Sequence, residues 1–158
     1  MIEYKRFRQY KEKLCGSCAV LSFLSSFGDV RHAPMEVQQR SLGDINELSI
    51  FVDEYYFKSE LVNAAFPMDY IEKKEPCVLF YREPNLSTYH ALAIKGFDEK
   101  HICTVGSSDV NITKIEISFI MESPDIYVLM KSRQQPNKMW GYLVVAVLFI
   151  GMSALITG

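Results

Sequence analysis

The chain has 158 residues and a formal net charge of −2, which suits one domain with a short appendage. Its residues are 49% hydrophobic and 23% charged. This composition excludes a disordered chain, because such chains lack the apolar surface that offsets their ordering entropy. The net charge excludes the strongly basic surface that is typical of nucleic-acid-binding proteins. The four Cys residues are too few for a small scaffold that depends on disulfides.

Helices are predicted in the first third of the chain, after a polar arm over residues 1–13. Apolar residues recur at helical spacing from Cys15 to Phe27, and Gly28 is a typical C-terminal stop. Residues 35–40 predict a further helical turn.

Asp44 begins a second long predicted helix, because Glu47 stands three residues further on, as in a capping box. The stripe of this helix that is expected to face inward consists of Leu48, Phe51, Val52 and Tyr55. Ser59 is expected to cap a third, short helix that ends at Pro67. Its apolar residues are Leu61, Val62 and Ala65.

Short apolar runs replace the helical spacing after Pro76. Strands are predicted over residues 77–81, 89–96, 101–106 and 126–130. Residues 98–100 predict a turn, and residues 115–121 fit either a short helix or a strand. Helices followed by an antiparallel sheet are typical of the α+β class.

The last 20 residues, 139–158, contain no charged side chain. At a helical rise of about 1.5 Å per residue they span about 30 Å, the thickness of a bilayer core. We therefore expect a transmembrane helix over 139–157 after a basic linker over 132–138, with a buried C-terminal helix as the alternative. The basic residues before this span favour a cytoplasmic location for residues 1–138, where the four Cys are expected as free thiols.

Cys15 stands at the start of the first long predicted helix. The positive end of the helix dipole and the unpaired N–H groups of the first turn favour a thiolate there. A nucleophilic Cys also needs a base, usually His. Among His32, His90 and His101, His90 has the most suitable context, because a strand start holds a side chain rigidly. The alternatives are a small buried thiol and an ordinary surface His.

The stretch CGSC over residues 15–18 also fits a thioredoxin-like redox motif. That motif should follow an apolar strand, whereas the residues before Cys15 are mostly polar. A metal site is a weaker alternative, because Cys77 and Cys103 are isolated and no second Cys-x-x-Cys is present. We therefore favour nucleophilic chemistry at Cys15.

The stretch Gln9-x5-Cys15-Gly16-x2-Ala19-Val20-Leu21 resembles the start of the bacteriocin-processing cysteine peptidases. These are papain-like domains that precede many peptidase-containing ABC transporters. In that family a Gln lies six positions before the nucleophilic Cys, and the catalytic His begins an apolar strand much later in the chain. His90-Ala91-Leu92-Ala93-Ile94 fits this description, and the run Pro76–Phe80 resembles the strand before it. The resemblance covers residues 4–131.

The resemblance implies a papain-like cysteine peptidase fold, in which N-terminal helices pack on an antiparallel sheet. It assigns to Cys15 the attack on the scissile carbonyl and to His90 the proton transfers. Gln9 would stabilise the oxyanion with its side-chain N–H, together with backbone N–H groups near Cys15. The resemblance implies no cofactor and no metal.

The chain departs from the family pattern at the third catalytic position. The family places an Asp at the end of the strand after the His, where it orients the imidazole, and this position is Gly106 here. Asp109 lies three residues further on and is the candidate orienter, with Ser107 as a weaker substitute.

Two hypotheses about function follow from the resemblance. The first is a stand-alone cysteine peptidase, tethered to the bacterial inner membrane and facing the cytoplasm, that cleaves double-glycine leaders from exported peptides or proteins. Its expected partners are the leader-containing substrate and an ABC exporter or other secretion component. The second is a catalytically weak or inactive domain that binds a leader peptide or a secretion partner at the membrane. Thiol redox chemistry is a third, less favoured alternative.

Overall fold

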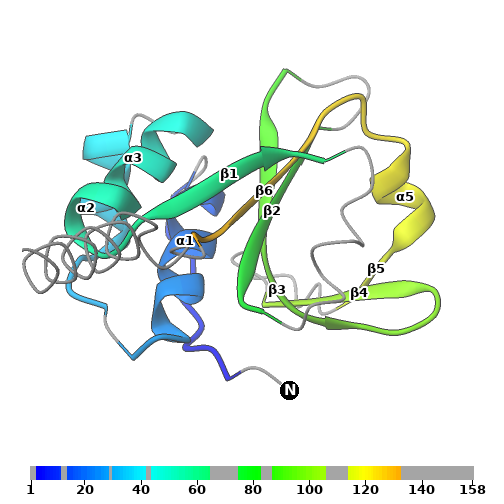
Figure 1. Cartoon of the computed structure of the whole chain (residues 1–158), viewed down its shortest axis with the longest axis horizontal. Helices are drawn as coiled ribbons and strands as arrows, with labels where there is room; N and C mark the ends of the chain where they lie inside the picture. The colour runs from blue at the N-terminus through cyan, green and yellow to red at the C-terminus, as the bar shows by residue number, and fades with distance from the viewer. Residues whose placement is uncertain are drawn as a thin grey trace, which may run out of the picture.

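The computed structural model describes residues 3–11, 14–28, 30–41, 44–64, 75–82, 87–105 and 114–132 (Figure 1). The described helices are α1 (Cys15–Ser25), α2 (Pro34–Ser41), α3 (Ile45–Tyr55) and α5 (Ile117–Met121). The described strands are β1 (Ser59–Asn63), β2 (Cys77–Arg82), β3 (Tyr89–Phe97), β4 (His101–Val105), β5 (Lys114–Glu116) and β6 (Ile126–Lys131). The strands form one sheet in the order β1-β6-β2-β3-β4-β5, and all neighbouring pairs are antiparallel. The α+β class is therefore confirmed.

The expected transmembrane helix over 139–157 and all of the expected linker except Ser132 lie outside the described residues. Among the helices that the structure does describe, none has the length and apolar character needed to cross a bilayer.

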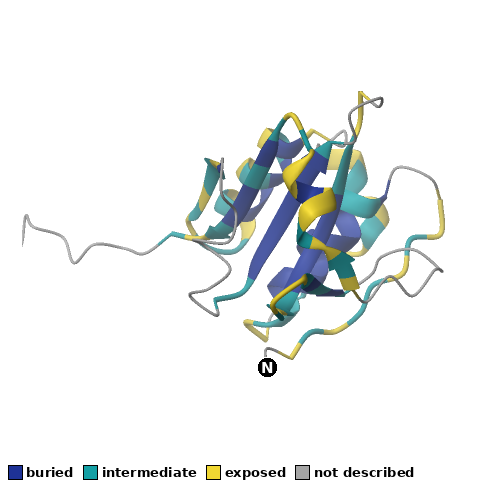
Figure 2. Cartoon of the chain, turned by 90° about the vertical axis from the view of Figure 1, so that its right-hand side faces the viewer, coloured by how far each residue is buried: buried dark blue, intermediate teal, exposed yellow. Residues whose placement is uncertain are grey.

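The sheet separates two apolar clusters, because successive strand residues point to opposite faces. On one face, Val78 and Phe80 of β2 pack with the residues of α1, α2 and α3. On the other face, Leu79 and Tyr81 pack with Ile120 of α5. Figure 1 shows the three N-terminal helices on one side of the sheet and α5 on the other. The buried residues form a continuous band through the central strands in Figure 2.

Helix α1 lies at the centre of the helical layer and is buried from Ser17 to Leu24. It contacts β2 and β3 on one side and α2 and α3 on the other. A helix that is enclosed in this way is expected to be apolar on nearly every face. Gly16 permits the close approach of α3, because a Cβ atom at this position would lie 2.9 Å from Leu48 Cδ1.

The helix predicted from Ser59 is wrong, because Ser59–Asn63 forms strand β1. Asp53 of α3 fixes the start of this strand, since its Oδ1 accepts hydrogen bonds from the Ser59 N–H at 2.6 Å and from the Ser59 hydroxyl at 2.7 Å. Leu61 and Val62 then pair with β6, whose edge would otherwise stay unpaired. The predicted continuation to Ala65 and Pro67 lies outside the described residues.

Other boundaries differ less from the sequence predictions. Asp44 caps α3 as expected, because its Oδ1 accepts from the Asn46 N–H at 2.6 Å. Tyr55 was expected to face inward, but it is 40% exposed and lies under the Arg40 guanidinium, whose Cζ is 4.5 Å from the ring centroid. Helix α1 ends at Ser25, and Gly28 adopts a φ of 84° in the turn that follows. Residues 115–121 are divided between β5 and α5.

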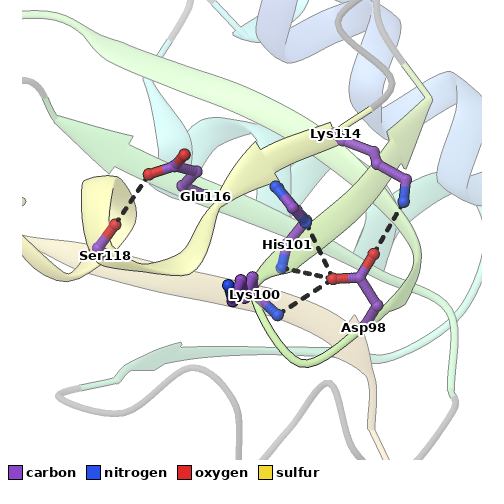
Figure 3. Close-up of polar contacts among 6 residues, drawn as sticks. All are labelled: Asp98, Lys100, His101, Lys114, Glu116 and Ser118. Carbon is purple, nitrogen blue, oxygen red and sulfur yellow. Dashed lines mark hydrogen bonds and ion pairs between the residues drawn. The ribbon is translucent and has the colours of Figure 1, made fainter.

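Asp98 ties the β3–β4 turn to β5 (Figure 3). Its Oδ1 accepts hydrogen bonds from the N–H groups of Lys100 at 3.1 Å and His101 at 2.8 Å, and the His101 Nδ1 is 3.0 Å away. Its Oδ2 accepts from the Lys114 ammonium at 2.8 Å. The Lys114 hydrogen bond, followed by the bond from the Lys100 N–H, holds the pKa of Asp98 well below its usual range. One exposed carboxylate thus connects three strands.

We predict that Asp98→Asn lowers the thermal unfolding temperature at neutral pH. The pKa of Asp98 is lower in the folded state than in the unfolded state. Its contribution to stability is therefore complete above the unfolded pKa of about 4 and is lost progressively as the pH falls from there through the lower pKa of the folded state. Thermal melts of the wild type and the variant should converge in acid. Glu99→Gln, in the same exposed turn, is the control. A constant difference between Asp98→Asn and wild type at all pH values would contradict this account.

Candidate active site

Cys15 is the first residue of α1, and no side chain caps this helix end. The first helical hydrogen bond runs from the Cys18 N–H to the Leu14 carbonyl at 2.9 Å, so the preceding N–H groups are left at the open end of the helix. The Cys15 thiol donates a hydrogen bond to the Tyr89 carbonyl, with 3.8 Å between Sγ and the oxygen. The half-exposed thiol therefore lies against the first residue of β3.

His90 follows Tyr89 and is the second residue of β3. It pairs directly with Tyr81 of β2, and the two rings stack with 5.4 Å between centroids and 28° between planes. Tyr81 is buried, and so is the His90 Nε2. The structure therefore brings Cys15 and His90 to the same end of β3. It also fixes the imidazole between a rigid strand and a buried aromatic ring.

The other two His residues take part in local structure elsewhere. The His32 Nδ1 lies 2.8 Å from the Tyr56 hydroxyl, and the His32 ring packs edge-on against Phe51 and Tyr55 of α3. His101 belongs to the Asp98 cluster of the β3–β4 turn. Of the three His residues, His90 is therefore the one that directly follows the residue whose carbonyl the Cys15 thiol contacts.

Gln9 lies in the N-terminal arm, residues 3–11, and is half-buried. Three contacts fix this arm to the fold. The Tyr4 hydroxyl donates to the Ile94 carbonyl at 2.5 Å, the Lys5 N–H donates to the Ser25 hydroxyl at 2.7 Å, and Phe7 packs on the helical core. Lys5 thus lies at the end of α1, and Gln9 follows four residues later in the arm.

The third catalytic position is not described by the structure. Strand β4 ends at Val105, which pairs with Ala93 of β3. Since the two strands are antiparallel, the chain leaves β4 toward the end of β3 that carries His90. Gly106, Ser107 and Asp109 follow, and all three lie outside the described residues.

The four free thiols differ in exposure. Burial raises the pKa of Cys18 and Cys77 to about 12, so both resist ionisation. Cys103 is half-exposed in β4. No strand leads into Cys15 within the described residues 3–11 and 14, so the strand that precedes a thioredoxin-like motif is not found there.

Sequence reasoning missed the aromatic residues beside the candidate pair. Tyr89 supplies the carbonyl that Cys15 contacts, and its ring packs edge-on against Tyr127 of β6 at 5.8 Å between centroids. Burial raises the pKa of the Tyr89 hydroxyl, and the nearby Asp125 carboxylate adds to this effect. Tyr81 holds the His90 ring. The sequence carries no signal for these partners, because they depend on the pairing register of β2, β3 and β6.

No protein-family model matches the chain, and no curated protein matches it in sequence. Solved structures do match its fold. The peptidase domain of Streptococcus ComA, a bifunctional ABC transporter of a quorum-sensing pathway, aligns with a TM-score of 0.68 over 82% of this chain and 100% of that domain, at 14% identity.

Two further structures give the same result. A double-glycine motif protease of an AMS/PCAT transporter, solved in complex with the leader peptide, has a TM-score of 0.64 and 14% identity, over 83% of this chain and 94% of that chain. A protein from Bacillus anthracis that is described as a C39-like peptidase has a TM-score of 0.64 and 9% identity, over 85% of this chain and 98% of that chain. The chain therefore has the fold of these peptidase domains.

We predict that iodoacetamide labels Cys15 first among the four thiols of the folded chain. Its sulfur is partly exposed at the N-terminus of α1, so that the reagent can reach it. Cys18 and Cys77 should react only after unfolding, because they are buried. Labelling followed by peptide mass spectrometry measures the four rates, and Cys103→Ala removes the other partly exposed thiol as a control. Equal rates for Cys15 and Cys18 in the folded chain would contradict this assignment.

Proposed function

We propose that this protein is a cysteine peptidase that cleaves double-glycine leaders from exported peptides or proteins. The observation that carries the proposal is the contact between the Cys15 thiol at the start of α1 and the carbonyl of the residue that precedes His90. It occurs in a fold shared with peptidase domains, one of which was solved with its leader peptide. Both the nucleophile and the base then belong to rigid elements, as catalysis requires.

In the proposed reaction, the Cys15 sulfur attacks the carbonyl carbon of the scissile peptide bond. His90 takes the thiol proton and passes it to the leaving amine, so that an acyl-enzyme forms. Water, deprotonated by His90, then releases the leader and restores the thiol. The buried stack on Tyr81 keeps the imidazole in place through both proton transfers.

The oxyanion of each tetrahedral intermediate needs donors that are already in position. The open N–H groups of the first turn of α1 point out of the helix end at which Cys15 lies. The side-chain amide of Gln9 is the proposed second donor. Removal of one such donor typically lowers kcat by ~10²–10³-fold.

The proposal includes a membrane tether formed by residues 139–157. The peptidase domain, residues 1–131, would then face the cytoplasm. It is supported by the charge-free stretch at 139–158 and by the basic residues that precede it. Removal of residues 139–158 should move the protein from the membrane fraction to the soluble fraction of cells. A full chain that stays in the soluble fraction without detergent would contradict the tether.

We predict that Cys15→Ala abolishes cleavage of a double-glycine leader peptide, because the other thiol of the first turn, Cys18, is fully buried. His90→Ala should lower kcat by ~10²–10⁴-fold through loss of the base, and Gln9→Ala by ~10²–10³-fold through loss of an oxyanion donor. The measurement is cleavage of a leader-containing peptide by the purified full chain, followed by mass spectrometry.

Cys103→Ala and His101→Ala are the matched controls, because each removes the same residue type from a site on β4. Both should retain cleavage. If several leaders bind to the wild-type protein and none is cleaved, the peptidase is excluded and the leader-binding module remains.

We further predict that Asp109 orients the imidazole of His90, so that Asp109→Asn lowers kcat without loss of folding. The loss should be smaller than the ~10⁴-fold found for the Asp of a serine triad, because a thiol is far more acidic than a serine hydroxyl. Glu99→Gln serves as the control, because its exposed carboxylate lies in the β3–β4 turn. An unchanged kcat in Asp109→Asn would exclude this role. A higher kcat in Gly106→Asp would then identify position 106 as the site at which the orienting Asp of the family is missing.

A further inference from the structure

The proposed peptidase leaves one feature of α1 unused, which is the second thiol of its first turn. Cys18 lies three residues after Cys15 on the same helix and is fully buried. Peptide hydrolysis needs no thiol at this position. A small apolar residue would also fill this buried position of α1.

The two thiols meet the main geometric requirement for a disulfide. In an α-helix the Cα atoms of residues i and i+3 are about 5 Å apart, and disulfides occur at Cα separations of about 4.4–6.8 Å. Their Cβ atoms are about 5–6 Å apart in a regular helix, whereas a disulfide needs about 3.5–4.5 Å. Bond formation therefore requires a shift on the order of 1–2 Å in the first turn.

This turn is the part of α1 that is best able to shift. Cys15 and Gly16 precede the first helical hydrogen bond, which is donated by the Cys18 N–H. The helix has no side-chain cap, and Gly16 has no Cβ atom to hinder rotation of the backbone. The turn can adjust while Cys18 and the residues after it stay buried against the sheet.

The surroundings of the two sulfurs are unequal in a way that suits a reactive thiol and a resolving thiol. Cys15 is half-exposed and accessible to a small oxidant, whereas Cys18 is enclosed. Burial, together with the negative charge of a Cys15 thiolate, raises the pKa of Cys18. The contribution of the Cys15 negative charge to the raised pKa of Cys18 disappears when Cys15 becomes a neutral sulfenic acid. Oxidation of Cys15 thus favours reaction of Cys18 with it.

We propose that Cys15 and Cys18 form a reversible disulfide that blocks the nucleophile and protects it from irreversible oxidation. This inference rests on the proposed function, because it concerns regulation of the same site. The oxidant is a peroxide. The Cys15 thiolate attacks one peroxide oxygen, the O–O bond breaks, and hydroxide leaves, so that sulfur loses two electrons and the peroxide gains them.

The Cys18 sulfur then displaces the hydroxyl group from the Cys15 sulfur. The S–S bond forms as the S–O bond breaks, and the thiol proton of Cys18 leaves with the hydroxide as water. A dithiol reductant reverses the reaction through thiol–disulfide exchange and restores both thiols. Without Cys18, the sulfenic acid would remain open to further oxidation to the irreversible sulfinic acid.

The test uses the purified full chain, treated with hydrogen peroxide and then alkylated with iodoacetamide after denaturation. Trypsin releases residues 14–31 as one peptide that contains Cys15 and Cys18 and no other Cys. We expect this peptide to lose two hydrogens and to carry no alkyl group. Dithiothreitol should restore both alkylation sites and leader cleavage. Cys18→Ala should instead yield sulfinic acid at Cys15, with a loss of cleavage that dithiothreitol does not reverse.

Cys103→Ala is the matched control and should behave as the wild type does. Cys18→Ser provides a second variant if Cys18→Ala does not fold, and the measurement on wild-type peptide 14–31 requires neither variant. The inference is overturned if peroxide adds oxygen to Cys15 of the wild type while Cys18 remains alkylated. The mass of peptide 14–31 reports the disulfide whether or not the protein has peptidase activity. If the disulfide forms in a protein that cleaves no leader, the proposed function is refuted, whereas the reversible disulfide stands.

Discussion

Helix α1 is enclosed between the sheet and two other helices, and the position of the candidate nucleophile depends on this burial. Every residue from Ser17 to Leu24 is buried, so the helix has little freedom to slide or rotate without exposing apolar surface. Gly16, ahead of this buried run, lets Leu48 of α3 approach the first turn closely. As a result, the open N-terminus of α1 is held against the start of β3, where Cys15 meets the Tyr89 carbonyl.

The proposed base, His90, is held by a separate set of contacts. It lies on β3, and the register of β2 against β3 places the Tyr81 ring beside the imidazole. Packing of the sheet therefore determines the orientation of the His90 ring, whereas packing of the helices determines the position of Cys15. The two layers meet at one end of β3, where Cys15 contacts the carbonyl of the residue before His90.

Local signals predicted the parts of the fold that depend on local chemistry. Asp44 is an N-cap whose side chain bonds to backbone two residues further on, and the apolar runs of β2, β3 and β6 are long enough to identify buried strands. Ser59–Asn63 was assigned wrongly, because its conformation depends on Asp53 and on pairing with β6, which sequence spacing does not reveal. The Cys15 and His90 positions followed from helix-start and strand-start patterns. The Tyr81 stack did not, because it requires the strand register.

The central claim is that Cys15 is a nucleophile positioned to attack a peptide carbonyl. A leader peptide that ends in an aldehyde tests it most directly, because an attacking thiolate forms a hemithioacetal with the aldehyde carbon. With an isotopically labelled aldehyde carbon, NMR of the full chain would detect the hemithioacetal, and its loss in Cys15→Ala but not in Cys103→Ala would locate the bond. Our account predicts one adduct, on Cys15, that competes with uncleaved leader and is absent in His90→Ala. A protein that binds the leader aldehyde but forms no adduct, or forms it on Cys103, would contradict it.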